Sequence, residues 1–191
     1  MAQPDPLSNG EFKPLPRDAV RICERLFAPP RLIAHLVLVH DAVCTLIDRI
    51  AAEFPEAHFD PDLVRFGAAV HDIGKTVHPD ELTESGKHRH QRAGFELLQA
   101  LGIPKERARF AWTHSNWTDG EQITLEDLLV ALADKSWKGK RIDALESLAA
   151  DLLSTATARP KWDCYAKLDD IIQCLAQEAD KKLAWQSSFP V

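Results

Sequence analysis

The chain has 191 residues, 45% of them hydrophobic, and a formal net charge of −6. This length and apolar content suffice for one globular domain with a substantial core. The negative charge excludes a general basic surface for nucleic acid or for an anionic membrane, so an anionic ligand would need a local basic pocket.

The first residues lack the basic and apolar regions of a secretory leader, and no run of 18 uncharged apolar residues occurs. The four cysteines, Cys23, Cys44, Cys164 and Cys174, are widely spaced without a CxxC pair. We expect them to be free thiols packed in the core. These features predict a cytoplasmic protein without a membrane segment.

Residues 1–16 hold four prolines and few large apolar side chains, which predicts an extended or loosely attached arm. Apolar residues at helical spacing follow over 17–27, where A-P-P stops the pattern. A long, mostly buried helix is predicted over 31–54. Asp60 and Pro61 then suit the N-cap and first turn of a helix that ends at His71 and Asp72, closed by Gly74.

The remaining chain continues in helical patterns. A short turn is predicted over 78–82 and a loop over 83–87. Thr124 and Asp127 resemble a capping box, and Asp143 with Glu146 opens another helix. The further helices expected are 88–101, 105–115, 124–139, 144–158 and 165–185. No strand-like alternation and no repeat occurs, so the predicted class is all-α, with one domain over 17–191.

Six residues that can bind a metal lie at the ends or on the buried faces of five predicted helices. They are His35, His71, Asp72, His90, His114 and Asp134. One such histidine taken alone is more often a hydrogen-bonded core residue, and a lone aspartate can cap a helix or pair with an arginine. All six must find buried partners at once, however, and a divalent cation would satisfy them together.

The adjacent His71 and Asp72 differ by about 100° around a helix, so a regular helix face cannot direct both to one ion. Their adjacency favours an Asp72 that bridges two metals while His71 binds one. Imidazole and carboxylate ligands without a nearby cysteine favour Fe, Mn, Zn, Co or Ni over a thiolate site or a site for Ca or Mg.

The order His35, His71-Asp72, Asp134 resembles the H...HD...D signature of the HD-domain metal-dependent phosphohydrolases, an all-helical superfamily. His90, in HQRAG, and His114 resemble the extra histidines of its dinuclear branches, and HDIGK strengthens the match. The resemblance covers residues 30–140. The GYP element of cyclic-dinucleotide phosphodiesterases is missing, because WTDGEQITLED follows His114.

The resemblance implies a single helical bundle, with a ligand-bearing core over about residues 30–140 and C-terminal helices over about 141–186. It also implies one or two metal ions. The first would be held by His35, His71, Asp72 and Asp134, and the second by His90, His114 and the bridging Asp72. Such ions lower the pKa of a bound water and promote phosphoester hydrolysis, in which Asp72 and Lys75 are the expected catalytic residues.

Three lysines are candidates for binding the substrate phosphate: Lys75, Lys135 and Lys138. Lys75 follows the HD pair, and the other two open a basic cluster that continues to Lys140 and Arg141. The alternative is that they are solvated lysines near helix C-termini, where the macrodipole favours cations. The expected partner is a small phosphorylated substrate such as a nucleotide. Trp112, Trp117 and Trp137 would stack on a base or pack in the core.

Two other functions remain open at this point. The same six ligands could hold a di-iron pair that activates oxygen, or a metal in a non-catalytic nucleotide-binding module. Of the other histidines, His40 points about 140° away from His35 and should not share its metal. His58 and His78 are expected in loops, and His88 could replace His90 or face the substrate.

Overall fold

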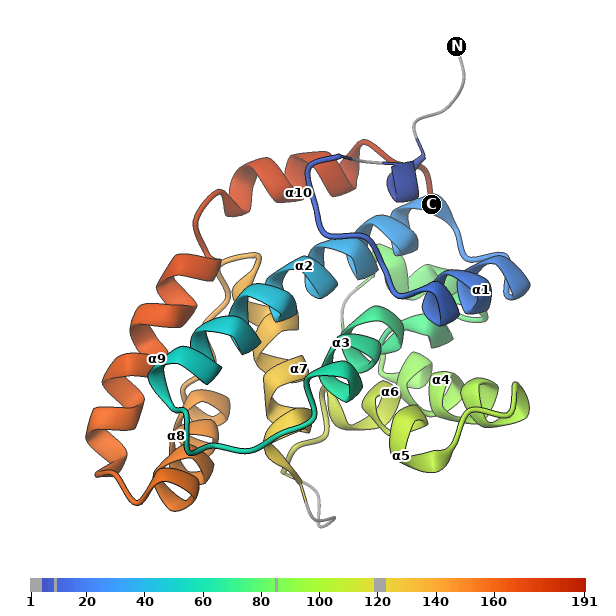
Figure 1. Ribbon diagram of the computed structural model, residues 1–191. Helices are drawn as coiled ribbons and strands as arrows, with labels where there is room; N and C mark the ends of the chain where they lie inside the picture. Colours follow the sequence, from blue (N-terminus) through green and yellow to red (C-terminus); the bar gives the residue numbers. More distant parts are fainter. Residues whose placement is uncertain (1–4, 9, 85, 119–122) are drawn as a thin grey trace.

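The computed structural model describes residues 5–8, 10–84, 86–118 and 123–191, and these residues form only helices joined by turns and coil (Figure 1). The all-α prediction is therefore confirmed. Residues 1–4 and 9 of the predicted arm, and 119–122 in the segment after His114, lie outside the described residues.

The elements follow the chain order that the sequence predicts, but two of the predicted helices are each divided into two. The α-helices are α1 (Arg17–Arg25), α2 (Pro30–Glu53), α3 (Pro61–Val70), α4 (Arg89–Ala100), α5 (Lys105–Ala108), α6 (Phe110–Thr113), α7 (Leu125–Ser136), α8 (Asp143–Thr157), α9 (Lys161–Leu175) and α10 (Ala179–Ser187). The 3-10 turns are η1 (Pro6–Ser8), η2 (Ile73–Thr76) and η3 (Pro79–Leu82).

Helix α2 crosses the middle of the molecule and packs against α3, α7, α9 and α10 (Figure 1). The length and composition of α2 would allow it to cross a membrane, but 72% of its most apolar 18-residue stretch is buried inside the molecule. Leu32 and Leu36 near its start join the core with α1 and α4, while Leu46 and Ile50 join the core with α7 to α9. One helix thus links both parts of the core.

Two predicted helix starts are confirmed in atomic detail. The Asp60 carboxylate accepts hydrogen bonds from the backbone N–H groups of Asp62 and Leu63 at the start of α3. Thr124 and Asp127 form the reciprocal capping box of α7. Both motifs are local, so the sequence is sufficient to predict them.

Three predicted boundaries are wrong. The helix predicted over 105–115 is interrupted at Arg109, whose guanidinium turns to the carboxylate of Asp127, 2.9 Å away. Asp143 is the first residue of α8 rather than its cap, which is Ile142. The helix predicted over 165–185 breaks before α10 at Glu178, which adopts a left-handed φ of 61°.

The last break allows the chain to fold back over α2. Trp185 of α10 then packs edge-on against Phe12 of the arm and Phe189, with ring centroids 4.8 and 4.9 Å apart. The backbone N–H of Lys13 donates to Asp41 of α2. The described part of the arm is therefore packed on α2 and α10 rather than loosely attached.

Candidate metal centre

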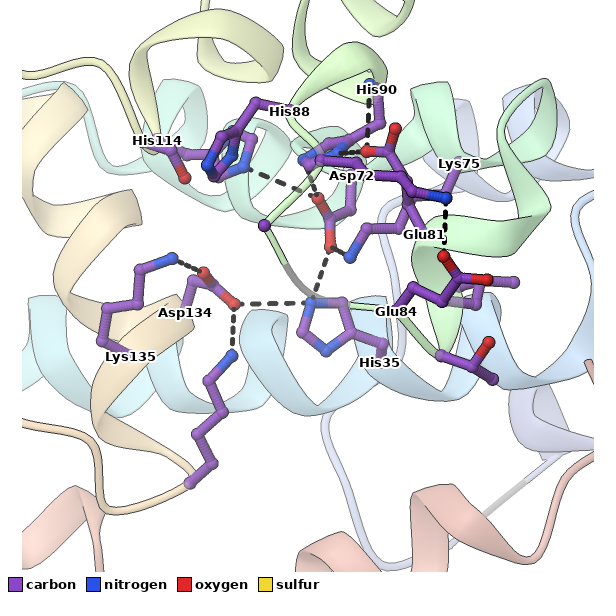
Figure 2. Close-up of a pocket in the computed structure, with 16 residues that line it drawn as sticks. His35, Asp72, Lys75, Glu81, Glu84, His88, His90, His114, Asp134 and Lys135 are labelled. Carbon is purple, nitrogen blue, oxygen red and sulfur yellow. Dashed lines mark hydrogen bonds and ion pairs between the residues drawn. The ribbon is translucent and has the colours of Figure 1, made fainter.

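The six predicted residues lie on or directly next to α2, α3, η2, α4, α6 and α7, and they meet beside the N-terminal half of α2. His35 lies on α2, His71 follows the last residue of α3, and Asp72 precedes η2. His90 lies in the first turn of α4, His114 follows α6, and Asp134 lies on α7. All six side chains are buried, and Figure 2 shows His35, Asp72, His90, His114 and Asp134 around a common centre.

The first group surrounds the Nε2 atom of His35. This atom lies 3.2 Å from Nε2 of His71, 3.1 Å from Oδ2 of Asp72 and 3.4 Å from Oδ1 of Asp134. Two ligands at about 2.1 Å from one ion lie about 3.0 Å apart in octahedral and about 3.4 Å apart in tetrahedral coordination. His35, His71 and Asp72 therefore fit a single first-row cation, and Asp134 lies close to the two histidines of this group.

The second group uses the other oxygen of Asp72. Its Oδ1 lies 3.1 Å from Nε2 of His90 and 3.5 Å from Nε2 of His114. The ligand atoms of Asp72, His90 and His114 all lie close enough together to hold an ion. Asp72 thus directs one oxygen to each group, which is the arrangement of a bridging carboxylate.

The ring orientation of three histidines is fixed from behind by acceptors. The Nδ1–H of His71 donates to the carbonyl of Ala68, and that of His114 donates to the carbonyl of Phe110. Nδ1 of His90 lies 2.5 Å from the carboxylate of Glu81. In each ring the Nε2 lone pair is left free to face the centre, as metal ligation requires.

Glu81 is a residue of the candidate centre that the sequence does not indicate. Its side chain is 1% exposed, and it accepts hydrogen bonds from His90 and from Arg89. Glu81 lies in the polar turn HPDEL, where a carboxylate normally faces solvent. No local signal indicates that α4 covers this turn and buries it.

Two glycines allow η2 and α4 to approach closely enough to bring His90 to Asp72. A Cβ on Gly74 would lie 1.9 Å from the carbonyl oxygen of His90, and one on Gly94 would lie 3.1 Å from the backbone nitrogen of Gly74. Gly74 does not adopt the left-handed conformation predicted for a helix-closing glycine. Its role is to permit a backbone contact between two elements, not to cap α3.

Three lysines neutralise the carboxylates of the centre. Nζ of Lys75 lies 2.6 Å from Oδ2 of Asp72, whereas Lys135 and Lys138 pair with Asp134. Burial raises the pKa of each aspartate, but neighbouring cations outweigh it. Lys75 holds the pKa of Asp72 well below its usual range, and Lys138 and Lys135 do the same for Asp134. Both acids are therefore ionised, as ligands must be.

The pKa values of the two histidines of the second group are shifted in opposite directions. Burial, together with the neighbouring His71, lowers the pKa of His114 well below its usual range, which keeps this imidazole neutral. For His90, burial acts in the same direction, but hydrogen bonds and charges of Asp72 and Glu81 raise its pKa overall. Protons therefore compete with a cation more strongly at His90.

A pocket of about 300 Å³ opens over both groups. Lys75, Lys135 and Lys138 line it, together with Glu81, Glu84 and His88 from the segment between η2 and α4 (Figure 2). The three lysines predicted to bind substrate therefore lie beside the candidate centre. Lys140 and Arg141 do not line this pocket.

The other singled-out residues lie away from the two groups. His40 is buried beside Cys44, with its Nε2 3.7 Å from the thiol. His58 is exposed, and His78 is half-buried outside the pocket lining. Exposed His88 lies at the pocket rim, with Nδ1 3.3 Å from the amide nitrogen of Gln91, so it does not replace His90. The four cysteines are free, and Cys23, Cys44 and Cys164 are buried as predicted.

Comparison with known proteins gives one result for this chain. A family model described as HD domain matches residues 16–136, which include all six predicted ligands. Neither the curated proteins nor the solved structures contain a match.

Proposed function

The chain belongs to the HD domain family, whose members are typically metal-dependent hydrolases, and we propose that it is a metal-dependent phosphohydrolase of small phosphoesters. The observation that carries this proposal is the position of Asp72, with one oxygen facing His35 and His71 and the other facing His90 and His114. Such a carboxylate can hold two cations side by side.

We assign His35, His71, Asp72 and Asp134 to one ion, and His90, His114 and Asp72 to the other. Bound ions of this kind lower the pKa of a water to about 7 and neutralise charge on a phosphoryl oxygen. The donor set of imidazole nitrogens and carboxylate oxygens fits Fe, Mn, Zn, Co or Ni.

The protein's own residues supply position and charge. Asp72 orients both groups of ligands, and Glu81 fixes the ring of His90. Lys75, three residues after Asp72, donates a hydrogen bond to the Asp72 carboxylate and lines the pocket. Its ammonium group can therefore leave this carboxylate and donate to a phosphoryl oxygen of the substrate instead. We propose Asp72 and Lys75 as the catalytic residues.

We also propose a cytoplasmic location. Free, buried thiols suit a reducing compartment. A small phosphorylated molecule is the proposed partner.

Metal reconstitution followed by a phosphoester assay tests the proposed function. We expect the protein to bind close to two equivalents of Mn, Fe, Co or Ni and to release inorganic phosphate from small phosphoesters. Oxygen consumption by an iron-loaded, coloured protein without phosphate release would instead identify a di-iron oxygenase. Tight nucleotide binding without any turnover would identify a binding module.

A further inference from the structure

Most of the described residues that line the pocket have charged or polar side chains. Of the described residues that form it, only Leu82 has a hydrophobic side chain. The others are charged or polar, apart from Gly86. A ligand of this pocket therefore meets many charged and hydrogen-bonding side chains.

No tryptophan offers a base-stacking surface in this lining. Trp112 lines a different pocket with Phe95 and Lys105. Trp137 is 1% exposed, and its ring packs behind His35 at a centroid distance of 5.8 Å. Trp117 packs against the core formed with α7. A nucleobase stacks on rings that are open to the ligand, and among the described lining residues the only ring outside the candidate centre is the imidazole of His88.

Three of the lysines that line the pocket pair with carboxylates of the candidate centre, and they form two groups. Lys75 pairs with Asp72, and its side chain is 17% exposed. Lys135 and Lys138 pair with Asp134 on α7, and their side chains are 15% and 29% exposed. One phosphoryl group at Lys75 would leave two partly buried ammonium groups to share a single carboxylate. Partly buried cations are stabilised by a further anion.

We propose that the substrate is a small, non-aromatic phosphoester that carries a second anionic group. This inference rests on the proposed phosphohydrolase function. Lys75 contacts the phosphoryl group that reacts, and Lys135 and Lys138 bind the second anion. Water forms a new bond to phosphorus, the bond between phosphorus and the ester oxygen breaks, and a proton from the water goes to the leaving oxygen. The products are inorganic phosphate and an alcohol that keeps its anionic group.

A matched pair of substrates tests the second anion directly. 3-Phosphoglycerate and glycerol 3-phosphate share a skeleton and differ by a carboxylate in place of a hydroxymethyl group. AMP carries its phosphate on a nucleoside and so has an aromatic base that the other two esters lack. With the Mn-loaded full chain, we expect kcat/KM for 3-phosphoglycerate to exceed that for glycerol 3-phosphate by about tenfold or more, since a charged hydrogen bond is gained. AMP should be the poorest of the three.

Two variants locate the selectivity. Lys138→Gln should reduce the ratio between 3-phosphoglycerate and glycerol 3-phosphate to below about threefold, because one ammonium of the second anion site is lost. Lys87→Gln is the matched control. Lys87 lines the same pocket but is paired with Glu84 and Asp80 at 2.5 and 3.0 Å, so this change should leave the ratio as it is.

Faster hydrolysis of AMP than of both small esters would overturn the inference while the proposed function stands. A ratio near one in the unchanged protein, or equal effects of the two lysine variants, would also overturn it. If none of the three esters is hydrolysed with Mn, Fe, Co or Ni, the proposed function fails. Calorimetric titration with the same compounds then decides the inference, and tighter binding of AMP than of 3-phosphoglycerate would contradict it.

Discussion

Asp72 and Glu146 are both buried carboxylates, but their surroundings differ completely. Glu146, on α8, receives two hydrogen bonds from Arg141 at 2.8 and 2.6 Å and a third from the backbone N–H of Ile142. Asp72 faces four imidazole Nε2 atoms and one lysine. The hydrogen bonds from Arg141 and Ile142 satisfy the carboxylate of Glu146, whereas the imidazole nitrogens around Asp72 can also bind a metal ion. Burial alone therefore does not distinguish a structural acid from a functional one.

Removing the shared ligand gives the largest expected effect. Asp72→Ala should lose both metals and lower activity by about 10³-fold or more, because metal catalysis supplies several kcal/mol. Metal content by mass spectrometry and phosphate release check this. Unchanged metal content in a folded variant would contradict the bridging role.

His114→Ala sharpens the comparison within the centre itself. It removes a ligand from the second group only, so the metal content should fall from about two equivalents to about one, with activity lower by roughly 10²-fold. The same mass spectrometric measurement applies. Loss of both ions would show that the two groups do not bind independently.

Glu81→Gln tests the carboxylate behind His90. The neutral amide orients and polarises the imidazole less, so affinity for the second ion should fall by about 10- to 100-fold. Calorimetric metal titration measures this. Arg89→Gln, which removes only the exposed partner of Glu81, is the control and should change affinity by less than about threefold.

Glu146→Gln changes the structural acid. Breaking its pair with Arg141 should lower the free energy of unfolding by about 2 to 3 kcal/mol, because Arg141 is partly exposed and keeps Asp169. Urea unfolding measures the loss. Metal stoichiometry should be unchanged, and a variant of normal stability with reduced metal content would reverse the assignment of the two acids.

The smallest expected effect is on the pH dependence of stability, through the buried His40. Burial lowers the pKa of His40 to about 4 from the usual 6.5, so the unfolded chain binds a proton more readily than the folded one. The associated stability is present above pH 6.5 and is lost as the pH falls towards 4. His40→Gln should show a decline between pH 7.5 and 5 that is smaller by about 1 to 2 kcal/mol. Parallel declines in both proteins would contradict this.

Features with local causes are predictable from the sequence. The caps at Asp60 and Thr124 depend on neighbouring residues, and most of the six candidate ligands are polar groups in an otherwise apolar helical pattern. Their convergence was predictable because buried polar groups need partners.

Features with tertiary causes were not predictable. The position of Gly74 after a helical pattern suggests a helix cap, but the close approach of the α4 backbone is the reason that a glycine is needed there. Glu81 becomes buried only when α4 docks on η3, and the break at Glu178 accompanies the packing of Trp185 against Phe12 of the arm. These contacts join separate segments of the chain, so the local sequence pattern of either segment does not predict them.

The most direct test of the central claim is anomalous X-ray diffraction from crystals of the metal-loaded protein, recorded at the absorption edge of the bound metal. We predict two peaks about 3.5 to 4 Å apart, one among His35, His71 and Asp134 and the other beside His90 and His114, with Asp72 between them. A metal bound away from Asp72, or no peak within bonding distance of these side chains, would contradict the account.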